Sequence, residues 1–235
     1  MQVAALVLGA GSGTRLRATL PTAPPKAWLR LAGRTLLGRS LDALAAVPGI
    51  ELLQPVIPEA AFAQWPEVEA ELRAPGRVAP PVAGGRERQD SVRAGLAALS
   101  AGVSHVAVHD AARPLVRADA VARVVEAARA HGAALLATPA GDTIHRVRDG
   151  HVVSTPPRAE CFAAQTPQVF RVDWLREALA KALAEGIVAS DDAALVARLG
   201  VRVHVVPGDP DNLKITTASD LALAEALLAA REAGA

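Results

Sequence analysis

The chain has 235 residues, of which 51% are hydrophobic and 3% aromatic, and its 25 basic and 24 acidic side chains leave a net charge of +1. This balance favours neither nucleic acid nor an acidic membrane surface, so local groups must hold any anionic ligand. Cys161 is the single cysteine, which excludes an internal disulfide and a cysteine-rich metal site, and no apolar run reaches the ~18 residues of a membrane helix. We therefore expect a cytoplasmic protein that binds neither nucleic acid nor membrane.

Apolar strand-like runs alternate with helical patterns along most of the chain. Such alternation is typical of a Rossmann-like α/β fold, a mostly parallel sheet with helices on both faces. The predicted strands are 3–8, 52–57, 78–82, 105–109, 133–138 and 201–206, and the predicted helices are 35–44, 60–72, 91–99, 118–130, 172–185, 191–199 and 218–233.

The pattern changes between residues 141 and 154, where polar and apolar residues alternate around Asp149 and Gly150. An Asp-Gly pair between alternating runs is a strong hairpin signal, and it predicts a two-stranded arm that projects from the sheet. An isolated hairpin is marginally stable in water, so we expect a second subunit to cover it. Without repeats or low-complexity linkers, the chain is interpreted as one domain, 1–235, with a dimerisation arm at about 140–167.

A glycine-rich turn, Gly9 to Gly13, directly follows the first strand, and the cations Arg15 and Lys26 come after it. Glycines let backbone N–H groups approach an anion closely, and the cations neutralise it, so the segment is interpreted as a triphosphate loop. The spacing matches neither the GxGxxG dinucleotide motif nor the P-loop. A flexible surface loop is the alternative.

A second glycine turn, Gly84 and Gly85, precedes the predicted helix at 91–99, with Asp90 and Ser91 near the helix start. Asp90 and Ser91 have two possible roles. They cap the helix, or they place a hydroxyl and backbone groups against a nucleotide base.

A third polar stretch follows the predicted strand 105–109. Ligands of open parallel sheets bind beyond the carboxyl ends of strands, where Asp110 and Arg113 would stand. Asp110 suits a hydrated Mg²⁺ or a ribose hydroxyl, and Arg113 suits an anion, unless the two form only a surface salt bridge. His109 is interpreted as a packing histidine rather than a catalytic base.

These motifs, with others further along, resemble in composition and order those of the 2-C-methyl-D-erythritol 4-phosphate cytidylyltransferases of the non-mevalonate isoprenoid pathway. The resemblance covers nearly the whole chain. It implies transfer of CMP from CTP to 2-C-methyl-D-erythritol 4-phosphate, with release of pyrophosphate, by in-line attack of the substrate phosphate on the α-phosphorus. The matching segments are the glycine loop with Arg15, 25–26, 84–92, 109–114, 142–143, 165–170 and 212–216.

The resemblance also implies roles for individual residues, a Mg²⁺ ion and a homodimer whose arm reaches into the partner subunit. Catalytic roles fall to Arg15, Lys26, Lys214 and Asp110, with Asp110 also holding the metal. The nucleotide would meet Ala10, Gly11, Gly13, Gly84, Gly85, Ser91 and Ala111. The methylerythritol phosphate would meet Arg113, Thr143, Arg158, Thr166 and Ser190.

Several residues depart from the family's usual motifs. Leu8 and Gly9 replace proline and alanine, Ala27 replaces glutamine, and Ser190 replaces threonine. Further along, Ala197 stands for glutamate and Thr217 for a basic residue.

Three other functions fit parts of the sequence. A cytidylyltransferase for ribitol 5-phosphate or another sugar or polyol phosphate would share the nucleotide half and differ around Thr143, Arg158 and Thr166. A dinucleotide oxidoreductase would need the GxGxxG motif. A non-catalytic binding protein on this fold would be expected to lose Lys26 or Lys214, and both are present.

Overall fold

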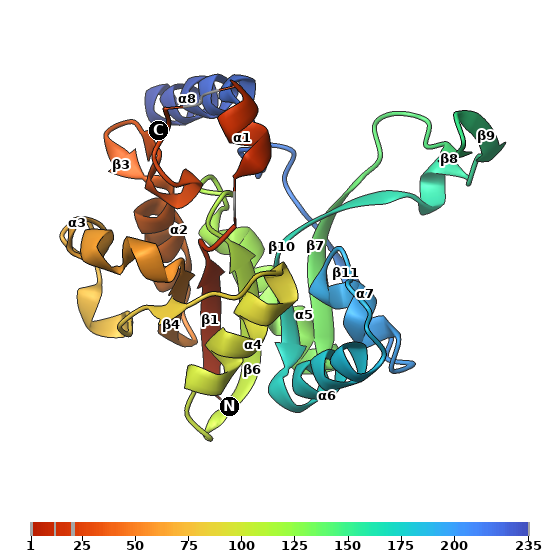
Figure 1. Ribbon diagram of the computed structural model, residues 1–235, viewed down its shortest axis with the longest axis horizontal. Coiled ribbons are helices and arrows are strands. Elements are labelled where there is room, and N and C mark those ends of the chain that lie inside the picture. Colours follow the sequence, from red (N-terminus) through yellow and green to blue (C-terminus); the bar gives the residue numbers. More distant parts are fainter. Residues whose placement is uncertain (1, 12, 20–21, 235) are drawn as a thin grey trace.

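The sheet is built around β1 (Gln2–Leu8), whose side chains from Val3 to Leu8 are apolar and buried on both faces. The computed structural model describes residues 2–11, 13–19 and 22–234, apart from the side chains of residues 15, 17 and 19. The seven-stranded sheet has the order β11-β7-β10-β6-β1-β4-β5, in which β10 runs antiparallel to both neighbours and the other pairs are parallel (Figure 1). This confirms the predicted α/β class with a mostly parallel sheet.

Two hydrophobic clusters cover the two faces of the sheet. Along β1, Val3, Ala5 and Val7 pack with helices α2 and α5, whereas Ala4 and Leu6 pack with α4, α6 and α7. The period-two alternation of a strand thus places both helical layers. The helices are α1 (Thr14–Thr19), α2 (Leu36–Ala45), α3 (Trp65–Glu69), α4 (Arg88–Ala98), α5 (Ala118–His131), α6 (Val172–Ala184), α7 (Asp192–Ala197) and α8 (Ala218–Ala233), with 3₁₀ turns η1 (Lys26–Trp28), η2 (Glu59–Gln64), η3 (Pro75–Arg77) and η4 (Arg158–Glu160).

The strands differ from the prediction mainly at β10 (Phe162–Arg171), which the sequence analysis missed. This strand contains Pro167 and the buried polar residues Gln165, Thr166 and Gln168, so it lacks an apolar pattern. The other strands are β2 (Arg30–Leu31), β3 (Arg34–Thr35), β4 (Ile50–Ile57), β5 (Val82–Ala83), β6 (Val103–Asp110), β7 (Ala133–Pro139), β8 (Arg146–Arg148), β9 (His151–Ser154) and β11 (His204–Pro207).

Four predicted elements are shorter than expected: α7 and β11 are each shorter by two or three residues, and the other two differ more. The helix expected at 60–72 is a 3₁₀ turn, η2, followed by the five-residue α3, because Pro66 at the first turn of α3 has no N–H to continue a helix from η2. The strand expected at 78–82 is only Val82–Ala83, preceded by one isolated bridge from Val78 to Leu53.

The predicted hairpin is present as β8 and β9, which pair antiparallel and project away from the main sheet (Figure 1). Asp149 and Gly150 both have positive φ at its turn. Val147, Val152 and Val153 are exposed on it by 60%, 58% and 54%. Among the described residues, no helix is long and apolar enough to cross a membrane.

Candidate active site

A cavity of about 270 Å³ opens at the carboxyl ends of β1 and β6. Leu8 and Asp110, the last residues of these two strands, are register partners. From β1 the chain moves outward through β4 to β5 on one side, whereas β6 lies on the other side. The cavity therefore occupies the topological switch point, where open α/β sheets bind ligands.

The two glycine turns form one wall of this cavity. Gly9 donates its N–H to Val56 O at 2.7 Å, and Gly84 donates to Ile57 O at 2.8 Å, so the sheet holds the turns next to each other. A Cβ on Gly84 would lie 2.3 Å from that of Ala10. The turns can pack this closely only because residue 84 has no side chain.

The start of α4 completes this wall. Its two candidate residues, Asp90 and Ser91, have different roles. Asp90 caps the helix, because its carboxylate accepts the Glu87 N–H at 3.1 Å in a capping box. Ser91 is buried and lines the cavity, and its hydroxyl accepts the Gly85 N–H at 3.1 Å. The helix N-terminus adds a partial positive charge that favours phosphate.

Asp110, at the end of β6, also lines the cavity and lies between two cations. Its Oδ2 lies 2.6 Å from Lys214 Nζ, and its Oδ1 lies 3.2 Å from Arg88 Nε. Burial alone would raise the pKa of Asp110, but Arg88 and Lys214 outweigh it and hold that pKa well below its usual range. The carboxylate is therefore ionised at neutral pH.

Arg88 and Asp192 extend this cluster, and the sequence analysis missed both as site residues. Arg88 Nη1 lies 2.7 Å from Asp192 Oδ2, and Asp192 is only 1% exposed. Burial raises the pKa of Asp192 in spite of Arg88. Buried charges require partners. The ion pairs therefore form one series, called here the ion-pair ladder, which runs from Lys214 through Asp110 and Arg88 to Asp192. It joins the nucleotide turn to the segment after Ser190. The sequence holds one signal that could have indicated Asp192 as a site residue, namely the acidic pair 191–192 directly after the predicted site residue Ser190.

Thr166 supports the cavity from behind. Its buried hydroxyl accepts the Asp110 N–H at 3.0 Å and lies 3.1 Å from His109 Nδ1, while His109 Nε2 lies 3.3 Å from Arg113 O. Burial lowers the pKa of His109 to about 4, so the ring is neutral and packed, as the sequence analysis interpreted it. The structure thus places the Thr166 hydroxyl on Asp110 and His109 rather than in the cavity.

Arg113 braces the loop that carries Lys214. Its guanidinium donates to Asn212 O at 2.6 Å and to Ala164 O at 3.2 Å, which joins this loop to β10. Burial lowers the pKa of Arg113. Arg113 is therefore oriented toward backbone carbonyls.

The structure brings together only part of the predicted site. Thr143 and Arg158 lie exposed on the arm, and Ser190 is exposed before α7. Arg15 belongs to α1, but its side chain lies outside the described residues. Gly13 and Gly84 support the turns without lining the cavity, with Gly13 in the left-handed region at φ +64°. The predicted residues that line the cavity are Ala10, Gly11, Lys26, Gly85, Ser91, Asp110, Ala111 and Lys214.

The structure shows the surroundings of four departures from the family motifs. Gly9 and Ala27 pack together, since a Cβ on Gly9 would lie 3.1 Å from the Ala27 Cβ. Thr217 is the N-cap of α8, and its hydroxyl accepts the Asp220 N–H at 3.2 Å. Ala197 is exposed at the end of α7.

The open sheet, its switch-point cavity and the combination of glycine turns with cations define an α/β fold of the nucleotidyltransferase type. A family model described as 2-C-methyl-D-erythritol 4-phosphate cytidylyltransferase matches residues 3–230. The chain belongs to the 2-C-methyl-D-erythritol 4-phosphate cytidylyltransferase family, as the sequence motifs predicted.

Individual relatives agree with this assignment. The chain is 43% identical over 230 residues to the 2-C-methyl-D-erythritol 4-phosphate cytidylyltransferase of Geotalea uraniireducens, with 97% of each chain covered. It is 38% identical to the solved enzyme of that name from Thermus thermophilus, with a TM-score of 0.75 and coverage of 97% of this chain and 98% of the other. The 4-diphosphocytidyl-2C-methyl-D-erythritol synthase of Anaerococcus prevotii gives a TM-score of 0.84 at 28% identity, covering 97% and 96%.

Proposed function

We propose that the chain transfers CMP from CTP to 2-C-methyl-D-erythritol 4-phosphate and releases pyrophosphate, a step in isoprenoid precursor biosynthesis in the cytoplasm. The observation that carries this proposal is the switch-point cavity, where two glycine turns face the Lys214–Asp110–Arg88 cluster. It combines a backbone surface for a nucleotide with cations for its phosphates.

The lining of the cavity suggests how CTP would bind. The base and ribose would lie against the close-packed turns around Ala10, Gly85 and Ser91, which line the cavity. The triphosphate follows the glycine loop toward Lys26 and Lys214, with Arg15 on the same loop. Two lysines suit this place because an ammonium group is a compact charge that adapts to several phosphate oxygens.

Asp110 is the residue that would hold Mg²⁺. In the described part of the chain, no group of three or more histidine, cysteine or acidic side chains forms a ready metal site. Mg²⁺ commonly binds through one or two carboxylates, substrate phosphates and water, and the ionised Asp110 in the cavity wall fits that pattern. When bound with CTP, the ion would neutralise phosphate charge.

The reaction requires positioning and charge neutralisation rather than a base. The attacking group is a phosphate that is already an anion, so no proton has to be removed from it. Lys26 and Lys214 would stabilise the charge that builds up around the α-phosphorus, and they act in a partly enclosed cavity where such interactions are strong. His109 is buried outside the cavity lining, and its ring nitrogens face Thr166 Oγ1 and Arg113 O.

The acceptor half of the site is completed by a second subunit. Thr143 and Arg158 flank the hairpin of β8 and β9, which projects away from the main sheet (Figure 1), and neither residue lines the cavity of its own subunit. The exposed valines of β8 and β9 give this arm an apolar surface to bury. A homodimer in which each arm reaches the partner's cavity would bring these residues to the methylerythritol phosphate, next to Ser190.

Pyrophosphate release, measured with Mg²⁺, CTP and either 2-C-methyl-D-erythritol 4-phosphate or ribitol 5-phosphate, tests the proposal. Turnover with the methylerythritol substrate at a kcat/KM at least about tenfold above that for ribitol 5-phosphate is expected. Turnover with ribitol 5-phosphate alone would reassign the acceptor. No turnover with either compound would refute the cytidylyltransferase assignment.

A further inference from the structure

The segment that joins α6 to α7 lies against the first turn of α4. Burial alternates along it, since Ile187 and Ala189 are partly buried against the hydrophobic cluster beneath α4, α6 and α7, whereas Val188 and Ser190 are exposed. Such alternation is typical of extended chain, in which successive side chains point to opposite sides. The segment 187–192, called here the acceptor segment, therefore presents Ser190 on the side away from the core.

The Gln89 side chain binds the backbone of the acceptor segment through two hydrogen bonds. Gln89 is the second residue of α4, and its Nε2 donates to Ile187 O at 3.0 Å, while its Oε1 accepts the Ala189 N–H at 3.4 Å. One amide group thus pairs with a backbone acceptor and a backbone donor that lie two residues apart. These bonds attach the backbone directly before Ser190 to the helix that follows the second glycine turn.

Arg88, the residue before Gln89, binds the acceptor segment on the other side of Ser190. Its Nη1 lies 2.7 Å from Asp192 Oδ2, and the same side chain lines the nucleotide cavity. Ser190 therefore lies between two points at which α4 contacts the segment. Both points belong to the helix turn that leads to Ser91, which also lines the cavity, so the nucleotide wall and the acceptor segment share one support.

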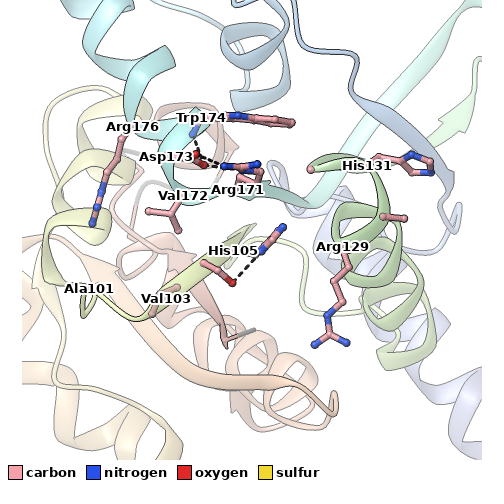
Figure 2. A pocket seen from close by; sticks show the side chains of 13 residues that line it. Ala101, Val103, His105, Arg129, His131, Arg171, Val172, Asp173, Trp174 and Arg176 are labelled. Carbon is pink, nitrogen blue, oxygen red and sulfur yellow. Dashed lines mark hydrogen bonds and ion pairs between the residues drawn. The ribbon is translucent and has the colours of Figure 1, made fainter.

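A comparable link between α6 and α4 lies at the opposite end of the sheet. There Arg176, on α6, donates to Leu96 O at 3.1 Å. Arg176 stands beside a hollow of about 670 Å³ that Val103, at the start of β6, also lines (Figure 2). The nucleotide cavity lies at the other end of this strand, at Asp110. Arg176 therefore joins the same two layers away from the cavity, which makes it a matched comparison for Gln89.

We propose that Gln89 is a positioning residue for the acceptor substrate and that it acts through the acceptor segment. The inference rests on the proposed function, in which Ser190 lies next to the methylerythritol phosphate. In-line attack requires the acceptor phosphate close to the α-phosphorus and correctly oriented, and a small displacement costs much of the rate. Gln89 fixes the backbone at Ser190 relative to the turns that hold the nucleotide, and it thereby sets where the acceptor stands.

Steady-state kinetics of the full-length enzyme separate this role from a general loss of stability. Gln89→Leu nearly keeps the size of the side chain and removes both hydrogen bonds. With saturating CTP it should raise the KM for the acceptor by about fivefold or more, while the Kd for CTP, measured by calorimetry, changes by less than about twofold. Arg176→Gln is the matched control, because it removes a bond to α4 at the far end and should leave both constants near those of the wild type.

Two further measurements test whether Gln89 acts through the acceptor segment. Ser190→Ala should itself raise the acceptor KM, and adding Gln89→Leu should raise it little further, because residues that serve one contact have non-additive effects. Hydrogen exchange, read by mass spectrometry on a peptide that spans 187–192, needs no turnover. Gln89→Leu should free the Ala189 N–H and speed exchange in that peptide, whereas Arg176→Gln should not.

The outcomes distinguish this inference from the proposed function. The acceptor is whichever of 2-C-methyl-D-erythritol 4-phosphate and ribitol 5-phosphate the wild type turns over, and turnover of neither would refute the function and this inference together. With an active wild type, an acceptor KM that is unchanged in Gln89→Leu, rises equally in Arg176→Gln, or rises in the double variant by the product of the single effects would refute this inference alone. Unchanged exchange at 187–192 in Gln89→Leu would refute it as well.

Discussion

Replacing Arg88 with glutamine should destabilise the protein in a pH-dependent way. Arg88 is the ion-pair partner of Asp192, which is 1% exposed, whereas Asp110 keeps Lys214 as a second partner. The variant thus leaves one buried carboxylate unpaired. Removing one partner of a buried ion pair costs about 3–5 kcal/mol, and we expect a loss near the lower limit, about 3 kcal/mol, because Asp110 stays paired. For a chain of this length that lowers Tm by roughly 6–12 °C.

The sign of the pH dependence follows from Asp192. Burial raises the pKa of Asp192 in the folded protein, and loss of Arg88 raises it further. A carboxyl with a raised folded pKa binds a proton more readily in the folded state than in the unfolded state. The loss of unfolding free energy caused by Arg88→Gln should therefore be largest well above the folded-state pKa of Asp192, and it should become smaller as the pH falls through that pKa.

Urea unfolding followed by circular dichroism at about pH 8 and about pH 5 measures both effects. Arg93→Gln is the control on the same helix, because the Arg93–Asp90 pair is 36% and 27% exposed and should contribute about 1 kcal/mol or less. A loss for Arg88→Gln no larger than that of the control, or a deficit that is equal at both pH values, would refute the ladder as described.

Three further changes test the cavity. Lys26→Ala should lower kcat for pyrophosphate release by about 10²–10³ with unchanged circular dichroism; an unchanged kcat would remove Lys26 from catalysis. Gly84→Ala should lose about 1–3 kcal/mol and bind CTP more weakly by calorimetry, since its Cβ would lie 2.3 Å from a neighbouring side-chain carbon, whereas Gly11→Ala, with open space, should keep its stability. Thr166→Val should lose about 1–3 kcal/mol in urea unfolding because the buried Asp110 N–H loses its acceptor, and Thr166→Ser should not.

The parts of the fold that the sequence predicted well depend on local pattern. β1 is an apolar run from Val3 on, β6 has an apolar centre at 106–108, and the Asp149–Gly150 turn carries its own hairpin signal. Leu8 and Asp110 could be expected at one sheet edge because the carboxyl ends of adjacent parallel strands meet there.

The parts that the sequence analysis missed depend on distant partners. Gln168 is buried in β10 because its amide accepts the Ala193 N–H at 2.9 Å and donates to Asp191 at 3.1 Å. Its polar side chain alone argues against a buried strand. Arg88 and Asp192 meet across 104 residues of sequence, and no local spacing indicates that pairing. Both cases are buried polar groups whose cost is offset only by tertiary contacts.

The proposed reaction is a single direct displacement at the α-phosphorus of CTP, with charge neutralisation in place of a covalent intermediate. The side chains of the described cavity agree with this, since the Ser91 hydroxyl contacts Gly85 N and Glu87 O, and Asp110 is paired with Lys214 and Arg88.

The most direct test is the stereochemical course with CTP that carries sulfur in place of one α-phosphate oxygen in a known configuration. Attack in line by the substrate phosphate predicts inversion at the α-phosphorus in the product, in which CMP is joined to the phosphate of methylerythritol phosphate. Retention, the result of two successive displacements through a covalent enzyme intermediate, would contradict the account.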